Sequence, residues 1–338
     1  MSGPAGADHT SGRSAADCAA DGRSADGRPA DSHAADRQAA QGSYTTQLGP
    51  APSRLPADWP HRGRSHTVKA GGLHWHVQHW PAPQPGAPLA LLLHGSGASS
   101  HSWAALAPLL ARTHAVLAPD LPGHAFTSRP RADGAADLTL PGVARSVAAL
   151  LQHLGAAPAL IVGHSAGAAI AAQLCLGGGA APQDLFSLNG AWFAPGGSER
   201  WWYSSLAKVL TLNPLVPHLF AWQAQRPAML QRLIDSTGSR LDAQALSHYR
   251  RLVADPAHVA GVLAMMAAWN LPPLLQALPR LQARLHLLVG ERDGTVPPQQ
   301  AGAVQRLVPG SRLLLLPGLG HLAHEEDAPR VLAAFEPG

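Results

Sequence analysis

The sequence is poor in the residues that disulfide frameworks, zinc sites and nucleotide-binding loops require. It has 2 cysteines, Cys18 and Cys175, so a disulfide framework or a cysteine-based zinc site is excluded by number. Its 2 lysines, Lys69 and Lys208, are not followed by Ser or Thr, which rules out a P-loop ATPase. The net charge is +4, but no basic run is interleaved with aromatic residues, so no nucleic-acid partner is expected.

Long apolar runs are also lacking. No stretch of about 18 apolar residues occurs, so no transmembrane segment is predicted. The N-terminus has no positively charged segment followed by an apolar core, which argues against a secretory signal. These features favour a cytoplasmic protein. Peripheral membrane attachment stays open, because the apolar run Val259–Trp269 could rest on a membrane surface.

The composition nevertheless suffices for a folded core, since 46% of the 338 residues are hydrophobic. Residues 1–52 are the exception. Residues 11–40 contain no Leu, Ile, Val or aromatic residue and cannot bury a core. We therefore predict that residues 1–52 form a disordered, low-complexity tail.

After the tail, short apolar runs alternate with helical patterns. Runs bounded by Gly, Pro, Asp or Asn are typical of strands buried on both faces. They lie at 89–93, 115–118, 160–162, 185–188, 285–289 and 313–316, after a strand-like stretch at 73–77. Helical patterns lie at about 102–111, 140–154, 166–176, 298–308 and 325–335. The alternation predicts an α/β fold, a mostly parallel sheet flanked by helices.

One block interrupts this alternation. Residues 191–279 are mostly helical in pattern and hold 5 of the 9 tryptophans. An insertion between strands of a parallel sheet lies over their carboxyl ends, where ligands bind. We predict a helical cap over 191–279 and a core formed by 53–190 and 280–338. Aromatic and Met side chains in the cap would suit a large apolar ligand, although such residues at helical spacing are usually core.

The strongest motif is Gly163-His164-Ser165-Ala166-Gly167. It matches the G-x-S-x-G nucleophile elbow, in which a strained turn between a strand and a helix exposes a serine hydroxyl. The flanks fit, because the strand-like 160–162 precedes the motif and a helix of small residues follows. The sequence therefore predicts Ser165 as a nucleophile.

A serine nucleophile needs a base, and the base needs an orienting acid. Asp293 follows the run at 285–289, and His321 follows the run at 313–316, in the order Ser, Asp, His. We predict Ser165, Asp293 and His321 as a catalytic triad. His324 is the alternative base and Glu291 the alternative acid.

An oxyanion hole needs two backbone N–H groups. Ala166, the residue after the nucleophile, is one predicted donor. The other is Ser96 in the loop after the strand at 89–93, with Gly97 as the alternative. The predicted substrate pocket adds neighbours of these residues and apolar residues of the cap: His94, Gly95, Gly97, His164, Trp192, Trp222, Met265 and Trp269.

Metal binding is not predicted. His74 and His76 lie on one face of a strand, but no Cys or carboxylate accompanies them locally, so we interpret them as a polar sheet face. The triad chemistry needs no cofactor.

Five motifs together resemble the α/β-hydrolase superfamily: His94–Gly97, Asp120–His124, Gly163–Gly167, Asp293 and Gly320-His321. Ala125 stands where that superfamily often has Gly, which bears on loop shape. A narrower group of segments (55–62, 70–78, 163–170, 236–239, 258–261 and 319–326) resembles the magnesium-chelatase accessory family of bacteriochlorophyll biosynthesis.

The resemblance implies a role near magnesium insertion into a porphyrin, in photosynthesis. A small-molecule substrate such as a tetrapyrrole, magnesium-chelatase subunits as partners, and a place at the photosynthetic membrane follow from it. The favoured interpretation is a serine-dependent hydrolase of an ester, thioester or related acyl compound. The alternatives are a non-catalytic porphyrin-binding module, an acyltransferase and a C–C bond hydrolase.

Overall fold

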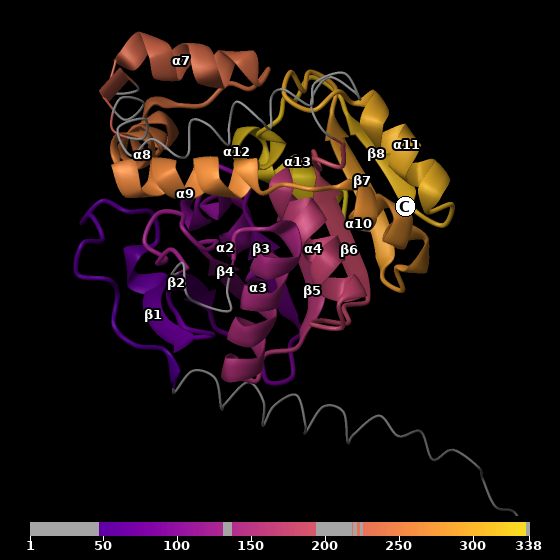
Figure 1. Ribbon diagram of the computed structural model, residues 1–338, viewed down its shortest axis with the longest axis horizontal. Coiled ribbons are helices and arrows are strands. Elements are labelled where there is room, and N and C mark those ends of the chain that lie inside the picture. The colour runs from indigo at the N-terminus through magenta and orange to yellow at the C-terminus, as the bar shows by residue number, and fades with distance from the viewer. Residues whose placement is uncertain (1–46, 131–136, 194–217, 219–221, 224–225, 336–338) are drawn as a thin grey trace, which may run out of the picture.

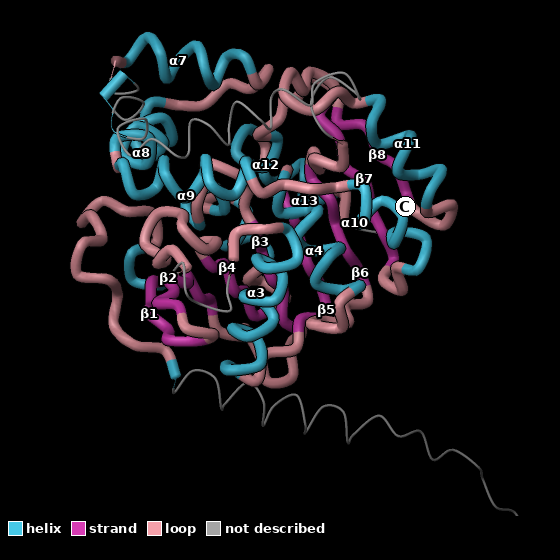
Figure 2. The backbone as a smooth tube through the Cα atoms, viewed as in Figure 1, coloured by secondary structure: helices cyan, strands magenta, loops and turns pink. Residues whose placement is uncertain are grey.

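A central eight-stranded sheet organises the protein. The computed structural model describes residues 47–130, 137–193, 218, 222–223 and 226–335. The strands are β1 (Ser65–Ala70), β2 (Leu73–Trp80), β3 (Leu89–Leu93), β4 (Ala115–Pro119), β5 (Pro158–His164), β6 (Asp184–Leu188), β7 (Arg284–Gly290) and β8 (Arg312–Leu316). They lie in the order β1-β2-β4-β3-β5-β6-β7-β8, as Figure 2 shows.

The sheet is parallel from β4 through β8, and only β2 pairs antiparallel, with β1 and β4. Each predicted apolar run lies in one of these strands, so the predicted α/β fold is confirmed. Strands β3 and β4 are buried at every position, as expected of strands covered on both faces. Strand β1 was not predicted, because its sequence is short and mostly polar, with Val68 and Ala70 as its apolar residues.

Helices cover both faces of the sheet. One apolar cluster packs α3 (Leu140–Leu154), α4 (Ala166–Leu176), α10 (Pro272–Ala277) and α11 (Gln299–Leu307) against the strands. A second cluster packs α2 (Leu106–Leu110) and α13 (Ala328–Ala333) against the other face. Short helical turns complete these layers: η2 (Arg62–Arg64), η3 (Ser100–Trp103), η5 (Leu278–Arg280) and α12 (Ala323–Glu326).

Two of the predicted core helices, α3 and α4, begin and end where the sequence patterns do. Helix α3 starts at the N-cap Thr139, whose hydroxyl accepts a hydrogen bond from Gly142 N–H, and ends at Gly155 with φ of 62°. Helix α4 follows Ser165 directly and is buried along most of its length. Its alanines and Gly167 allow it to lie close to the sheet.

The inserted segment contributes α7 (Pro227–Ser236), α8 (Ala243–Ala254) and α9 (Pro256–Ala267), which lie together beyond one end of the sheet (Figure 1). Helix α9 contacts the core at backbone level, since a Cβ on Gly261 would lie 1.9 Å from Gly123 O. Much of the predicted cap, including Trp201 and Trp202, lies outside the described residues. The domain boundaries therefore stay a prediction.

The predicted tail also lies mostly outside the described residues. Its last residues do contact the core, because Gly49 forms an antiparallel bridge with Thr67 of β1. In the part of the chain that the structure describes, no single helix is long and apolar enough to cross a membrane, and one pair, Pro256–Ala267 with Pro272–Arg280, meets the length and composition together across a 59° bend.

Candidate active site

Ser165 occupies a strained turn between β5 and α4. Its φ of 52° and ψ of −117° are unusual for a residue with a side chain. The turn is held by Ser165 N–H, which donates to Leu188 O at 3.0 Å, and by Ala191 N–H, which donates to Ser165 O at 3.0 Å. Ser165 is only half-buried, so its side chain retains access to the outside of the turn.

Gly163 and Gly167, on either side of Ser165, lie where a side chain would collide with the backbone. A Cβ on Gly163 would lie 2.5 Å from Gly167 O, and a Cβ on Gly167 would lie 2.1 Å from Leu93 O. Both contacts are with backbone atoms, which cannot move aside as a flexible side chain can. The spacing G-x-S-x-G is therefore what allows β3, β5 and α4 to meet at this serine.

Asp293 and His321 form a buried pair beside this turn. His321 Nδ1 donates to Asp293 Oδ2 at 2.8 Å, and the two side chains are 7% and 0% exposed, respectively. Asp293 Oδ1 accepts from the N–H groups of Thr295 and Val296, both at 2.8 Å. These hydrogen bonds hold the Asp293 carboxyl group in place, and it in turn fixes the orientation of the His321 ring.

The structure distinguishes these two residues from their alternatives. Glu291 is exposed and its carboxylate accepts from Gly318 N–H at 2.8 Å, away from His321 Nδ1. His324 is fully buried in α12, and burial together with the charge of His321 lowers its pKa to about 3. His164 is buried as well, and its Nε2 donates to His321 O at 2.9 Å. Burial lowers the pKa of His164 well below its ordinary value.

Within the described residues, the Ser165 hydroxyl makes no hydrogen bond. Contacts between a nucleophile and its base are often long without substrate and shorten when substrate binds. Ser165, Asp293 and His321 follow β5, β7 and β8 at one edge of the sheet, and their action as a catalytic triad stays a prediction.

The loop after β3 lies against Ser165. A Cβ on Gly95 would lie 3.1 Å from Ser165 Cβ and 2.8 Å from His164 Nδ1, so only glycine fits there. Gly97 has a φ of 80°, a region that favours glycine. Ser96 is exposed and Ala166 is buried at the start of α4. Both proposed oxyanion donors therefore lie next to the elbow.

Two histidines hold this loop. His94 Nδ1 donates to Gly95 O at 2.8 Å, while His94 Nε2 accepts from Leu121 N–H at 2.8 Å, which fixes a neutral ring. Burial and the neighbouring His124 lower the pKa of His94 to about 3. From the inserted segment, His258 Nε2 donates to Gly97 O at 3.3 Å. His94 is thus completely buried and orders the loop from behind.

The predicted apolar pocket residues lie in different environments. Trp192 and Met265 are each 1% exposed and belong to the main core cluster, against which Trp269 also packs. Trp222 is 57% exposed, and the Arg226 guanidinium lies 5.1 Å from its ring centroid. Their contact with a substrate stays a prediction.

Sequence reasoning missed Asn189, which follows β6. Its Nδ2 donates to Asp293 Oδ2 at 2.7 Å, next to the bond from His321. Its φ of 48° lies in the left-handed region, which Asn tolerates better than most residues. A turn after a predicted strand was the only sequence signal.

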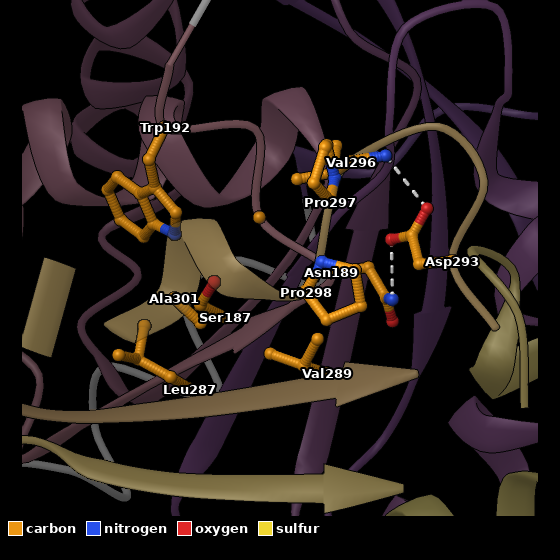
Figure 3. Close-up of a pocket in the computed structure, with 11 residues that line it drawn as sticks. Ser187, Asn189, Trp192, Leu287, Val289, Asp293, Val296, Pro297, Pro298 and Ala301 are labelled. Atoms are coloured by element: carbon orange, nitrogen blue, oxygen red, sulfur yellow. Dashed lines mark hydrogen bonds between the residues drawn. The ribbon is translucent and has the colours of Figure 1, made fainter. Parts of the chain in front are cut away.

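A cavity of about 10 Å³, the room of roughly one water molecule, lies behind this contact. Ser187, Asn189, Trp192 and Asp293 are among the residues that line it (Figure 3). Asn189 Oδ1 is buried without a hydrogen-bond partner among the described residues. The cavity is too small for an organic substrate.

A second buried His–Asp pair was also missed. His76 Nδ1 donates to Asp120 Oδ2 at 2.7 Å, and both side chains are 0% exposed. His74 and His76 lie on one polar face of β2, as interpreted; His74 is exposed, whereas His76 is buried against Asp120, which follows β4. Within the described residues, no group of three or more His, Cys, Asp or Glu side chains could hold a metal ion.

Comparison with known proteins agrees with the fold. The α/β hydrolase fold family matches residues 88–328. The structure is similar to an α/β hydrolase fold protein from Burkholderia ambifaria, with TM-score 0.65, 24% identity and coverage of 80% of this chain and 96% of that one. It is also similar to a thermophilic esterase from Thermogutta terrifontis, with TM-score 0.61, 20% identity and coverage of 80% and 96%. These two likenesses show the fold alone.

The chain therefore belongs to the α/β-hydrolase fold family, as its motifs predicted. Within that family it is 36% identical over 277 residues to the magnesium-chelatase 30 kDa subunit of Rhodobacter capsulatus. The match covers 82% of this chain and 95% of that protein. The narrower resemblance to the magnesium-chelatase accessory proteins is also confirmed.

Proposed function

We propose that this protein is a serine hydrolase that uses Ser165, His321 and Asp293. The observation that carries the proposal is the buried Asp293–His321 hydrogen bond of 2.8 Å beside a serine held at a φ of 52°. A buried carboxylate that binds Nδ1 leaves Nε2 of the same ring as a base. A strained serine at a helix N-terminus is the matching nucleophile.

The reaction would proceed in two halves. Ser165 Oγ attacks the acyl carbon while His321 Nε2 takes the hydroxyl proton, and the N–H groups of Ala166 and Ser96 stabilise the oxyanion. His321 then gives the proton to the leaving alcohol, thiol or amine. Water, deprotonated by His321, attacks the acyl-enzyme and releases the acid and the free serine.

The Rhodobacter capsulatus relative and the inserted segment together support a proposal for the class of substrate. The name of the Rhodobacter capsulatus relative supports a role beside magnesium chelatase, with association with its subunits. We propose an acyl substrate with a large apolar part, such as a tetrapyrrole ester, bound beneath the inserted segment. Trp192 and Met265 already stand at the boundary between that segment and the core.

The second candidate is a porphyrin-binding accessory module without catalysis. The similarity to a chelatase subunit favours it, and a fold of this family can carry functions other than hydrolysis. The buried Asp293–His321 pair argues for the hydrolase, since porphyrin binding does not require it.

Active-site labelling separates the two candidates. Wild-type protein and the Ser165→Ala variant are treated with a fluorophosphonate probe and with a smaller sulfonyl fluoride, and adducts are counted by intact mass. The proposal expects about one adduct per wild-type chain and none in the variant. Absence of an adduct with both probes, combined with tight porphyrin binding by fluorescence quenching, would establish the binding module instead.

A further inference from the structure

The turn between α7 and α8 contacts the catalytic loops of the core. This turn, Ser236–Ser239, belongs to the inserted segment, yet Thr237 O accepts hydrogen bonds from two core loops. Gly294 N–H, next to Asp293, donates at 3.1 Å, and His321 N–H donates at 3.1 Å. The Thr237 carbonyl therefore joins the loop that holds Asp293 to the loop that holds His321.

The backbone N–H groups on either side of His321 also donate hydrogen bonds. Leu322 N–H donates to Ser239 Oγ at 2.8 Å, and Gly320 N–H donates to Glu326 Oε1 at 2.7 Å. Three successive N–H groups, at 320, 321 and 322, thus bind three different acceptors. Two of those acceptors, Thr237 O and Ser239 Oγ, lie in the turn.

Glycines make this close approach possible. A Cβ on Gly238 would lie 1.8 Å from Arg292 O, and one on Gly320 would lie 2.4 Å from both Gly238 C and Ser239 Oγ. A Cβ on Gly294 would lie 2.4 Å from Ser236 O. Backbone therefore packs on backbone, which leaves the loops little room to shift independently.

We infer that Ser239 is a positioning residue for His321, and that the Ser236–Ser239 turn sets the register between His321 and Asp293. Ser239 itself is 2% exposed, and its hydroxyl oxygen binds the N–H of Leu322, the residue after His321. The inference rests on the proposed serine-hydrolase function. It implies that the inserted segment is a fixed part of the catalytic site at this turn rather than a separable cover.

The test compares Ser239→Ala with Ser247→Ala. Ser247 lies in α8 of the same segment, and its hydroxyl donates to Gln244 O of its own helix and to no core loop among the described residues. Two readouts are used: the second-order rate of fluorophosphonate labelling, and the low-field proton NMR resonance of His321 Nδ1–H, assigned by its loss in His321→Gln. Thermal unfolding by circular dichroism confirms that each variant is folded.

We expect Ser239→Ala to lower the labelling rate by about 10- to 100-fold, as small misplacements of catalytic groups do, and to shift or broaden the resonance. Ser247→Ala should match wild type in both. A wild-type rate and an unchanged resonance in Ser239→Ala would overturn the inference alone. If wild type is not labelled, the proposed function fails, and the resonance in wild type and Ser239→Ala still decides whether the turn positions His321. Should Ser239→Ala not fold, Ser239→Cys, which keeps the volume but accepts hydrogen bonds poorly, takes its place.

Discussion

Two buried His–Asp pairs of nearly equal geometry lie in this protein. The Nδ1–Oδ2 distance is 2.8 Å for His321–Asp293 and 2.7 Å for His76–Asp120. The difference lies in the surroundings of the histidine. The His321 ring lies 4.8 Å from the ring of His164, the residue before the strained Ser165, whereas His76 Nε2 is buried without a hydrogen-bond partner in the described part of the chain. A buried His–Asp pair is therefore a candidate catalytic pair only where a possible nucleophile lies near its histidine.

The acid of each pair has a different task. Asp120 accepts from Ser100 N–H at 2.7 Å and Phe126 N–H at 3.2 Å, so it joins η3 to the loop after β4. Burial alone would raise the pKa of Asp120, but the charge and hydrogen bond of His76 and the Ser100 N–H hold it well below its ordinary value. Asp293 instead binds the short turn that follows it.

The largest contrast is expected from removing one charge at each pair. Asp293→Asn should slow fluorophosphonate labelling by about 10⁴-fold, as the wrong histidine tautomer does in serine proteases, and should also lower the unfolding free energy, because the Asp293 carboxylate is as buried as that of Asp120. Asp120→Asn should cost about 3 kcal/mol of unfolding free energy and slow labelling less than tenfold. Labelling kinetics and urea unfolding measure the two effects. Equal rate losses in both variants would erase the distinction between the pairs.

The histidines around the two pairs predict a pH dependence of stability. Burial is the main cause that lowers the pKa of His94, His124 and His324 to about 3 and that of His258 to about 4. Between these values and the unfolded value near 6.5, the unfolded chain binds more protons, so stability rises with pH. We expect the unfolding free energy to fall by about 2 kcal/mol or more between pH 7 and pH 5.

Glu325 provides the control for that experiment, because it titrates in the opposite sense. Burial raises its pKa to about 8, so the folded state binds the extra proton between about 4.5 and 8 and stability falls as pH rises. Glu325→Gln removes this opposing contribution. The decrease in stability from pH 7 to pH 5 should therefore be steeper in the variant than in wild type. A shallower decrease would show that Glu325 is ionised in the folded protein at neutral pH.

A smaller effect is expected at Asn189, which contacts Asp293 and has no counterpart at Asp120. Asn189→Gly keeps the positive φ accessible and removes the hydrogen bond of 2.7 Å to Asp293. We expect roughly 1 kcal/mol of destabilisation and about a fivefold lower labelling rate. Asn189→Ala should be less stable than Asn189→Gly because it also strains the backbone. If Asn189→Gly is labelled as fast as wild type, Asn189 has no part in orienting Asp293.

The smallest effect on stability is expected at Ala125, a residue with positive φ in the loop after Asp120. Ala125, where the superfamily often has Gly, has a φ of 44° and its N–H donates to His258 Nδ1 at 3.0 Å. Ala125→Gly should raise the unfolding free energy by about 1 kcal/mol and leave labelling unchanged. Thermal unfolding measures the change. A lower stability in Ala125→Gly would mean that the alanine methyl contributes more by packing than the strain costs.

The sequence predicted those features that are determined by residues close together in the chain. Helix α3 has its cap residues Thr139 and Gly155 in the sequence, and the elbow glycines lie within two residues of Ser165. The order of Ser165, Asp293 and His321 along the chain was enough to find the Asp293–His321 pair. The two contacts that the sequence did not reveal, His76–Asp120 and Asn189–Asp293, join residues 44 and 104 positions apart.

The same limit explains the turn at Ser236–Ser239. In the sequence, residues 236–239 are noted for the family resemblance alone, and only the fold brings Thr237 O to His321 N–H. Burial likewise distinguishes the two candidate acids, since Asp293 is buried and Glu291 is exposed. From the sequence, Asp293 could be preferred only for its later position in the loop.

The most direct measurement is to map the covalent adduct after fluorophosphonate treatment, by proteolysis and tandem mass spectrometry. The account predicts one modified site, at Ser165, with labelling that is abolished in Ser165→Ala and nearly abolished in Asp293→Asn. An adduct at another residue, or a wild-type rate in Asp293→Asn, would contradict the claim that the His321–Asp293 pair activates Ser165.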